Sequence, residues 1–322
     1  MKKHKICKIL LVILAIFLCV AFYELLGICV AYKKQPEVSN TTKKETKNGS
    51  WNECSENTER AVIIEKNPEA LLQRVRLIKN AKKEIILSTF AFQSDESGKL
   101  ILGALHDAAD RGVHIRLLVD GMESWIDMEG NPYFYGLSSH ENVEIKLYNK
   151  ANPLKPWKMM GRMHDKYLIA DGKRYILGGR NTYNYFLGDF PGHKNYDRDV
   201  LVVCDEPEKE NSVNQLSEYF ETIWNQEDSG YFHNNKKLAN RKSVKNAVLE
   251  LQNSYQKYFE ENKERICETD YTDETFETEK ITLVSNPIHT GSKEPVVWYQ
   301  LGELMKNAKN RVKIHTPYII CN

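Results

Sequence analysis

The sequence has almost no net charge. Its 322 residues contain 45 Lys and Arg against 44 Asp and Glu, which leaves a formal charge of +1. The chain therefore lacks the overall positive charge with which nucleic-acid-binding proteins attract phosphate backbones. We accordingly do not expect nucleic acid as a partner, although a local basic groove would escape this count.

Cysteine is present but without the spacing of a metal site. The seven cysteines are an odd number at irregular intervals, and none forms a Cys-x-x-Cys pair: Cys7, Cys19, Cys29, Cys54, Cys204, Cys267 and Cys321. Zinc sites need closely spaced ligand pairs, so we expect no metal and no cofactor. Cys54 and Cys267 could form a disulfide outside the cell, but the sequence does not decide this.

Long apolar runs are absent except at the N-terminus. Ile9 to Tyr32 is apolar apart from Glu24. As a helix this run is about 36 Å long, enough to cross a bilayer. It is longer than the core of a usual signal peptide and has no clear cleavage site, so we favour an uncleaved anchor over a signal peptide. The preceding lysines slightly favour a body outside the cytoplasm.

The stretch from 33 to 59 has almost no apolar residues, and we expect it to be a flexible tether. About 260 residues then remain for folded structure, which suits one large or two small domains. We place a first folded unit at 60–265 and a second, incomplete one at 266–322.

Beyond residue 60 the pattern alternates between strands and helices. Strands are expected at Ala61–Glu65, Glu84–Phe92, Val113–Val119 and Val143–Tyr148, and helices at Lys99–Ala109, at Ser212–Gln226 and from Asn67 onward. Helical spacing also predicts a long helix within Lys236–Ile266. Such alternation predicts an α/β fold with a mixed sheet and helices on both faces.

The most informative stretch is MHDKYLIADGKRYILGGRN, from Met163 to Asn181. Its alternation and its Asp-Gly pair predict a β-hairpin that turns at Asp171. Two residues apart on a strand, His164 and Lys166 would project from one face. Gly178 and Gly179 would let backbone approach a ligand closely. Together with the amide of Asn181, these groups suit the chemistry of a phosphodiester.

The spacing His-x-Lys-x₄-Asp followed by Gly-Gly-x-Asn resembles the signature of the phospholipase D superfamily, and the surrounding residues resemble its bacterial cardiolipin synthase branch. The resemblance implies a phospholipase D-like fold and a phosphohistidine intermediate formed by His164, without a metal. It implies that Lys166, Gly178, Gly179 and Asn181 bind the substrate phosphate. It assigns catalytic roles to Lys166 and Asp171, and gives Asp197 the role of hydrogen-bonding the imidazole, although the turn alone would explain Asp171.

One short internal repeat supports two similar halves. Leu77–Phe92 and Leu304–Ile319 share the run KNAK at an offset of 227 residues, and Ile281–Ser285 is the expected counterpart of the first strand. A second His-Lys motif would fall beyond Asn322. We therefore expect a fragment whose site is completed by a second half or by a second copy in a homodimer.

The resemblance favours a membrane-anchored phosphatidyltransferase that acts on a phosphatidylglycerol-like phospholipid. The alternatives are a phospholipase D-type hydrolase or nuclease, and an inactive fragment. Two segments offer apolar surface for lipid: the loop Ala151–Gly161, which contains Trp157 and two methionines, and the aromatic loop 183–191. Ordinary loop packing would explain the first of these loops equally well.

Overall fold

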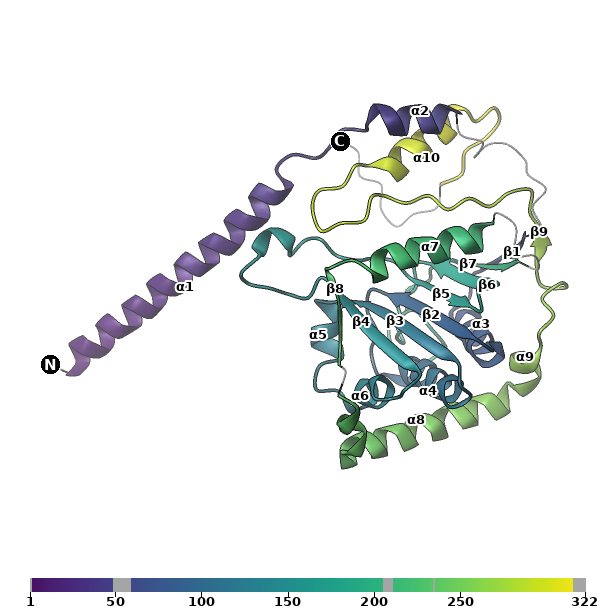
Figure 1. Cartoon of the computed structure of the whole chain (residues 1–322), viewed down its shortest axis with the longest axis horizontal. Coiled ribbons are helices and arrows are strands. Elements are labelled where there is room, and N and C mark those ends of the chain that lie inside the picture. Colours follow the sequence, from purple (N-terminus) through teal and green to yellow (C-terminus); the bar gives the residue numbers. More distant parts are fainter. Residues whose placement is uncertain (1, 49–58, 205–210, 234, 315–322) are drawn as a thin grey trace.

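The computed structural model describes residues 2–48, 59–204, 211–233 and 235–314. Its body is a mixed sheet between helices, as the alternating pattern predicts (Figure 1). The sheet has nine strands in the order β8-β4-β3-β2-β5-β6-β7-β1-β9. The parallel strands are β2 (Glu84–Thr89), β3 (His114–Asp120) and β4 (Val143–Tyr148).

The other strands run antiparallel to their neighbours. They are β1 (Glu59–Ile64), β5 (Tyr167–Ala170), β6 (Arg174–Gly178), β7 (Asp199–Cys204), β8 (Ser229–Tyr231) and β9 (Phe276–Glu277). The hairpin β5–β6 occupies the middle of the sheet, between β2 and β7.

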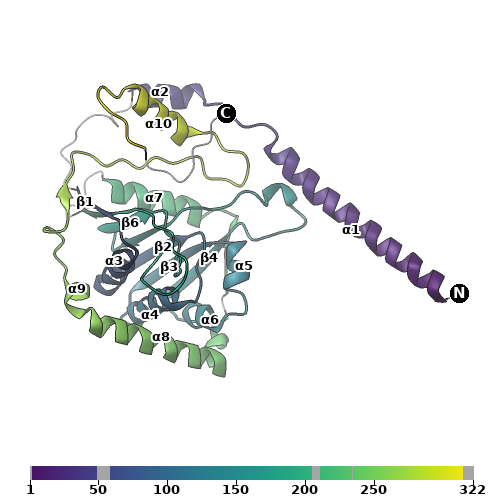
Figure 2. The ribbon, with the colours of Figure 1, turned by 180° about the vertical axis from the view of Figure 1, so that it is seen from behind.

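Helices cover both faces of the sheet, which confirms the predicted fold class (Figures 1 and 2). One face carries α3 (Asn67–Asn80), α4 (Glu96–Asp110) and α6 (Pro132–Ser138), with α8 (Lys242–Glu261) and α9 (Lys263–Cys267) packed outside them. The other carries α7 (Ser212–Trp224), which buries Leu216, Phe220 and Ile223 against the sheet. Apolar faces of this kind bury themselves against a sheet because water is then excluded from both.

Local signals explain where the helices begin. Asp95 caps α4, because its carboxylate accepts a hydrogen bond from the Gly98 N–H at 3.1 Å. α3 has Pro68 in its first turn, where no donor is lost. The short helices α5 (Glu123–Asp127) and α6, and the strand β8, have too few residues for their periodicity to be recognised in the sequence.

The first helix, α1 (Lys2–Tyr32), projects away from the body (Figure 1). Its segment Lys5–Tyr32 is long and apolar enough to cross a membrane, with a mean hydropathy of 2.9 in its best window. A signal sequence would pass the same test, so length and composition alone support an anchor only weakly.

Two sequence predictions outside the sheet are wrong. The tether predicted at 33–59 contains a helix, α2 (Asn40–Asn48), which Ser39 caps through its hydroxyl and which lies beside α10 (Val296–Lys306). The strand predicted at Ile281–Ser285 is an extended loop without strand partners in the described structure. α10 does lie where the repeat places the counterpart of α3. Cys54 lies outside the described residues, so its pairing with Cys267 stays a prediction.

Candidate active site

The motif hairpin forms, but it is shorter than its alternation suggests. β5 begins at Tyr167, so His164 and Lys166 precede the strand instead of lying on it. The ladder still reaches Lys166, because the Gly178 N–H donates to its carbonyl oxygen at 3.1 Å. The turn is closed by Asp171, with φ of 54°, and Gly172, with φ of 63°. Both lie in the left-handed region that an Asp-Gly hairpin turn favours.

His164 and Lys166 meet over the ring of Phe90, which the sequence did not single out. The rings of Phe90 and His164 are edge to face, with centroids 4.8 Å apart. The Lys166 ammonium lies 5.3 Å from the centroid of the same ring. Phe90 directly follows β2, the neighbour of β5 in the sheet. An aromatic residue at the end of a buried strand beside a motif strand was the available signal.

The environment shifts the pKa of both motif residues downward. Burial lowers the pKa of Lys166 to about 8, and nearby carboxylates oppose the shift. Burial, followed by the positive charge of Lys166, lowers the pKa of His164. A histidine shifted in this direction is neutral at pH 7 and keeps a free lone pair, which a nucleophile needs.

A buried carboxylate holds the start of the motif. Asp120, at the C-terminal end of β3, accepts hydrogen bonds from the Met163 N–H at 3.0 Å and from the Arg162 guanidinium at 3.1 Å. Burial raises the pKa of Asp120, and Arg162 opposes that shift. Arg162 also donates to the carbonyl oxygen of Asn149. In the sequence, Asp120 directly follows the strand expected at Val113–Val119, and the carboxyl ends of parallel strands are where such sheets commonly hold functional groups.

The two motif glycines make room for carboxylates. A Cβ at Gly178 would lie 2.0 Å from an Asp199 carboxylate oxygen, and one at Gly179 would lie 2.0 Å from an oxygen of Asp197. Real atoms do not approach this closely, so larger residues would displace these side chains. The glycines were expected to admit a ligand. In this structure, their open sides admit Asp197 and Asp199.

Asp197 and Asp199 differ in their surroundings. Asp199 is fully buried and forms ion pairs with Arg74 at 2.9 Å and Arg180 at 3.2 Å. Asp197 is partly exposed, and its charge acts on Lys166. No hydrogen bond joins Asp197 to His164 among the described residues, so the role predicted for Asp197 stays a prediction.

Asn181 is oriented with its amide nitrogen free. Its side-chain oxygen accepts a hydrogen bond from the Ala91 N–H at 3.2 Å. The amide N–H₂ group has no hydrogen-bond partner in the part of the chain that the structure describes, and it can donate to an anionic oxygen. The intervening Arg180 instead serves the fold, since it donates to Asn67 and to the carbonyl oxygens of Ile64 and Glu65.

Asp171 has a structural role in the folded chain, and the catalytic role predicted for it stays a prediction. This residue lies at the turn, at the far end of β5 from Lys166. Its carboxylate accepts backbone hydrogen bonds from Lys82, Lys83 and Glu84 at 2.7 to 3.1 Å, which fixes the start of β2. The turn and these bonds account for an aspartate at this position.

The motif opens into a cavity of about 370 Å³. Its walls include four basic side chains, namely those of Arg162, His164, Lys166 and Lys293. Apolar residues complete it: Leu177, Leu216, Leu283 and Val297. Part of the wall therefore comes from the segment 283–297, which the sequence analysis assigned to the second unit. Asp165 also lines the cavity, and the Tyr219 hydroxyl donates to it at 2.7 Å.

The expected absence of a metal and of any other cofactor stays a prediction. The described residues contain no cluster of three or more His, Cys, Asp or Glu side chains able to hold a metal ion.

The aromatic loop predicted to contact lipid instead packs inward. Phe186 and Leu187 are buried in the core, and Tyr183, Tyr185 and Phe190 pack against it.

A family model described as "Cardiolipin synthase, PLD-like domain" matches residues 74–224. Cardiolipin synthase C of Escherichia coli K12 is 30% identical over 154 residues, which cover 44% of this chain and 31% of that protein. Cardiolipin synthase 1 of Staphylococcus aureus MRSA252 is 34% identical over 117 residues, covering 36% of this chain and 23% of that protein. An uncharacterized protein of Helicobacter pylori J99 is 30% identical over 212 residues, which cover 61% of this chain and 39% of that protein.

The solved structures to which the chain is similar include two with 17% sequence identity. The phospholipase D family member Nuc from Salmonella typhimurium has a TM-score of 0.41 and covers 54% of this chain and 99% of its own. A phosphatidylserine synthase from Haemophilus influenzae has a TM-score of 0.45 and covers 69% of this chain and 48% of its own.

The family model and the named relatives show that residues 74–224 form a domain of the phospholipase D superfamily, whose members, such as cardiolipin synthase, are enzymes. Within that superfamily, it lies near the cardiolipin synthase branch. The chain spans about two fifths or less of the length of the relatives described above.

Proposed function

We propose that the chain carries one half of a phosphatidyltransferase site that acts on phospholipids of the phosphatidylglycerol type. The observation that carries this proposal is the cavity at the motif. It combines a neutral imidazole, that of His164, with the cations Lys166, Arg162 and Lys293 and an apolar wall. Cations suit a phosphodiester, and the apolar wall suits the glyceride part of a lipid better than it suits a nucleotide chain.

In the proposed reaction, a ring nitrogen of His164 attacks the phosphorus of the donor lipid. A bond between nitrogen and phosphorus forms as the bond from phosphorus to the leaving glycerol oxygen breaks. Lys166 and the Asn181 amide would hold the non-bridging oxygens as charge develops on them. The proton for the leaving alcohol would come from an acid of the second motif, which the family resemblance places in another half or in a second copy.

The hydroxyl that accepts the phosphatidyl group determines the product. A second phosphatidylglycerol gives cardiolipin, and water gives phosphatidic acid. We propose the lipid acceptor because the family model and the named relatives are cardiolipin synthases. Hydrolysis is the alternative, and one product analysis separates the two.

The proposed organisation follows from the same elements. α1 would anchor the chain in the cell membrane, with the body on the extracytoplasmic side, and 60–265 would form the motif-bearing half. Residues 266–322 would begin a second half. In support, α10 occupies the place of α3 in the repeat, and 283–297 closes the cavity from that side.

The test is an incubation of the full chain, purified in detergent, with labelled phosphatidylglycerol. Intact mass should show one phosphatidyl group added to the parent chain and none added to His164→Ala. His114→Ala is the matched control, because His114 lies on β3 among the carboxylates of Glu84 and Glu144, away from the cavity. A phosphatidyl group on the His164→Ala chain would overturn the assignment of the nucleophile.

The lipid products are identified in the same incubation. They are also identified in a parallel incubation of a chain that is extended through a second motif. Cardiolipin and glycerol support the transferase. Phosphatidic acid as the sole lipid product would overturn it in favour of the hydrolase.

A further inference from the structure

Six large apolar side chains are exposed on two short segments that follow β3 and β4. Trp125 and Ile126 of α5 are each 68% exposed, and Leu154 in the loop 151–161 is 78% exposed. The set comprises Met122, Trp125, Ile126, Leu154, Trp157 and Met160. Scattered apolar residues are ordinary on a protein surface, but a group gathered at one edge marks an interaction site.

The two segments begin side by side. β3 and β4 are parallel neighbours, and Asp120 is paired with Tyr148 where they end. The next residue, Gly121, donates its N–H to the Tyr148 carbonyl at 2.7 Å. A Cβ at Gly121 would lie 2.7 Å from the Lys150 Cα, so only glycine permits this approach. In both views of the ribbon, α5 lies at the edge of the body nearest α1 (Figures 1 and 2).

The apolar helix α1 contacts the same loop. The Tyr23 hydroxyl donates to the Leu154 carbonyl at 3.0 Å. Gly27 faces Pro156 so closely that a Cβ there would lie 2.4 Å from the proline ring. The loop is therefore fixed at a defined position along the axis of α1, near Tyr23 and Gly27.

That height corresponds to the surface of a bilayer. A hydrocarbon core of about 30 Å takes about 20 helical residues, so a span that starts at Ile9 ends near Ile28. Gly27 and Pro156 would then lie at the boundary between hydrocarbon and head groups, with Leu154 slightly deeper, beside Tyr23. Trp and Tyr are the residues most enriched at this boundary.

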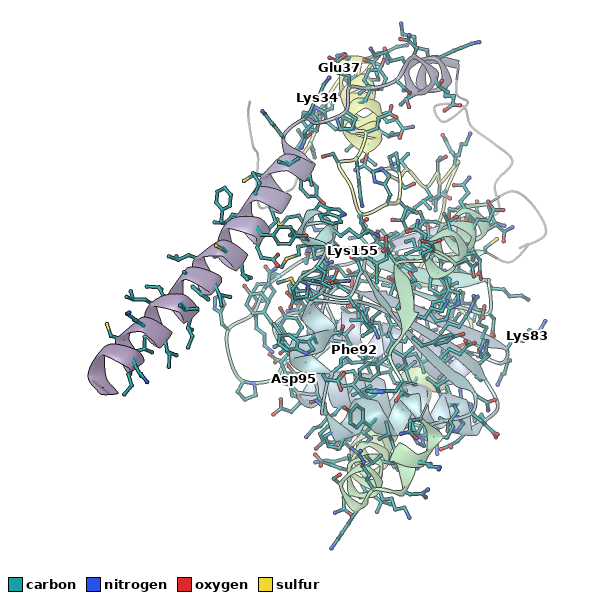
Figure 3. All side chains as sticks on the ribbon, turned by 60° about the vertical axis from the view of Figure 1, so that its left-hand side comes forward. Lys34, Glu37, Lys83, Phe92, Asp95 and Lys155 are labelled. Atoms are coloured by element: carbon teal, nitrogen blue, oxygen red, sulfur yellow. The ribbon has the colours of Figure 1, made fainter. Side chains whose placement is uncertain are left out.

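The charge of the loop suits the same position. Lys155 is exposed and lies on the side of the body that faces α1, whereas Lys83 lies on the opposite side (Figure 3). Basic side chains near a membrane surface are attracted to anionic lipids by about 1 kcal/mol each.

The loop is also tied to the candidate active site. The Asn149 amide donates to the carbonyl oxygens of Lys158 and Gly161, at 2.7 and 2.8 Å. The carbonyl of Asn149 in turn accepts a hydrogen bond from Arg162, which lines the cavity. A loop held at the head groups would therefore hold the cavity at the height of lipid phosphates.

We propose that α5 and the loop 151–161 form a membrane-docking surface whose apolar side chains enter the leaflet beside α1. A bilayer is the occupant that fits, because the surface is continuous with a helix of membrane-spanning length. The inference rests on the anchor in the proposed function; its first test does not depend on the reaction at His164, whereas its second test, which measures turnover, does.

The test uses the full chain in vesicles of phosphatidylcholine and phosphatidylglycerol that contain lipids brominated near the head group. Three variants each keep one surface tryptophan, Trp125, Trp157 or Trp298, and the other two and Trp51 are changed to Phe. Trp224 is buried in the core and stays in all three as a common background. Trp298 on α10 is the matched control, since its exposed fraction of 68% equals that of Trp125.

We expect the bromolipid to quench Trp125 and Trp157 at least about twofold more than Trp298. Equal quenching of all three in chains that float with the vesicles would overturn the docking surface. Chains that do not float with the vesicles would show that α1 is not a membrane anchor, and the docking surface would be overturned with it. Formation of phosphohistidine is measured in detergent, so neither failure is confused with failure of the proposed reaction.

A second measurement avoids changes to tryptophan. Lys155→Glu should reduce turnover in vesicles rich in phosphatidylglycerol several-fold and leave turnover in detergent unchanged. Lys83→Glu, on the opposite side of the body, should change neither rate. An equal effect of the two substitutions in vesicles would contradict the proposed orientation.

Discussion

The ammonium group of Lys166 donates a hydrogen bond to the backbone carbonyl oxygen of His164 at 2.5 Å. The same ammonium lies over Phe90, against which the His164 ring also packs. The cation of the motif is therefore held next to the imidazole before any substrate arrives. A phosphodiester oxygen would take the place of the carbonyl as its partner, which makes Lys166 the natural first subject for mutation.

Lys166→Met should stabilise the fold and abolish turnover. The pKa of this ammonium falls from 10.5 to about 8 on folding, so the folded state disfavours its charge. At about 1.4 kcal/mol per pKa unit, the variant could gain up to about 3 kcal/mol of unfolding free energy at pH 7. The lost hydrogen bond to His164 will reduce this gain.

The direction of this change in unfolding free energy can be checked through its dependence on pH. The unfolded chain binds more protons between pH 8 and 10.5, so the parent gains stability as pH rises through that window and the advantage of the variant shrinks. Denaturant unfolding at pH 7 and pH 10 measures this. Lys173→Met, an exposed lysine on the same hairpin, is the control. A variant less stable than the parent at pH 7 would contradict the expectation.

The pKa of His164 should rise in the Lys166→Met variant. Burial and the Lys166 charge both lower this pKa, and the substitution removes the second cause. The imidazole should therefore titrate at higher pH than in the parent, which ring-proton resonances of the detergent-solubilised protein can follow. An unchanged titration would mean that the two side chains are not coupled, and His164→Ala identifies the resonance.

Asp199→Asn should lower the stability of the protein, whereas Asp197→Asn should lower its turnover. Asp199 pairs with two buried arginines, Arg74 and Arg180, and its neutralisation removes the carboxylate that forms ion pairs with both. Breaking a buried pair costs about 3–5 kcal/mol, so the thermal midpoint should fall sharply. Asp197 is partly exposed, and Asp197→Asn should retain the fold while slowing turnover. Thermal unfolding and turnover, measured on both variants, decide this; equal loss of stability would contradict it.

Asp171→Ala should lower stability without lowering the activity of the folded molecule. It removes the acceptor for three backbone N–H groups at the start of β2 and places alanine at a positive φ. We expect a loss of about 1–3 kcal/mol. Asp171→Asn keeps an acceptor oxygen and tolerates the left-handed backbone, so it should lose less. A fall in turnover per folded molecule, with little loss of stability, would support the catalytic role predicted for Asp171 instead.

The sequence predicted the sheet and the motif hairpin because both depend on local patterns. Alternation, the Asp-Gly turn and the spacing of His164, Lys166 and Asn181 are all visible within a few residues. Phe90, Asp120 and Lys293 come from distant segments, and only the folded chain brings them to the hairpin. The helix α2 was missed for a related reason: its polar sequence has no apolar stripe of its own, and it lies against α10.

The central position of β5–β6 in the nine-stranded sheet has a further consequence. Both edges of the hairpin are bonded to other strands, so its amide hydrogens should be among the last in the protein to exchange with solvent. His164 and Lys166 directly precede β5, so they are attached to the stiffest part of the molecule. Any motion that admits a substrate or releases a product must then occur in the segments that surround the cavity, above all 283–297, which contributes no strand to the sheet.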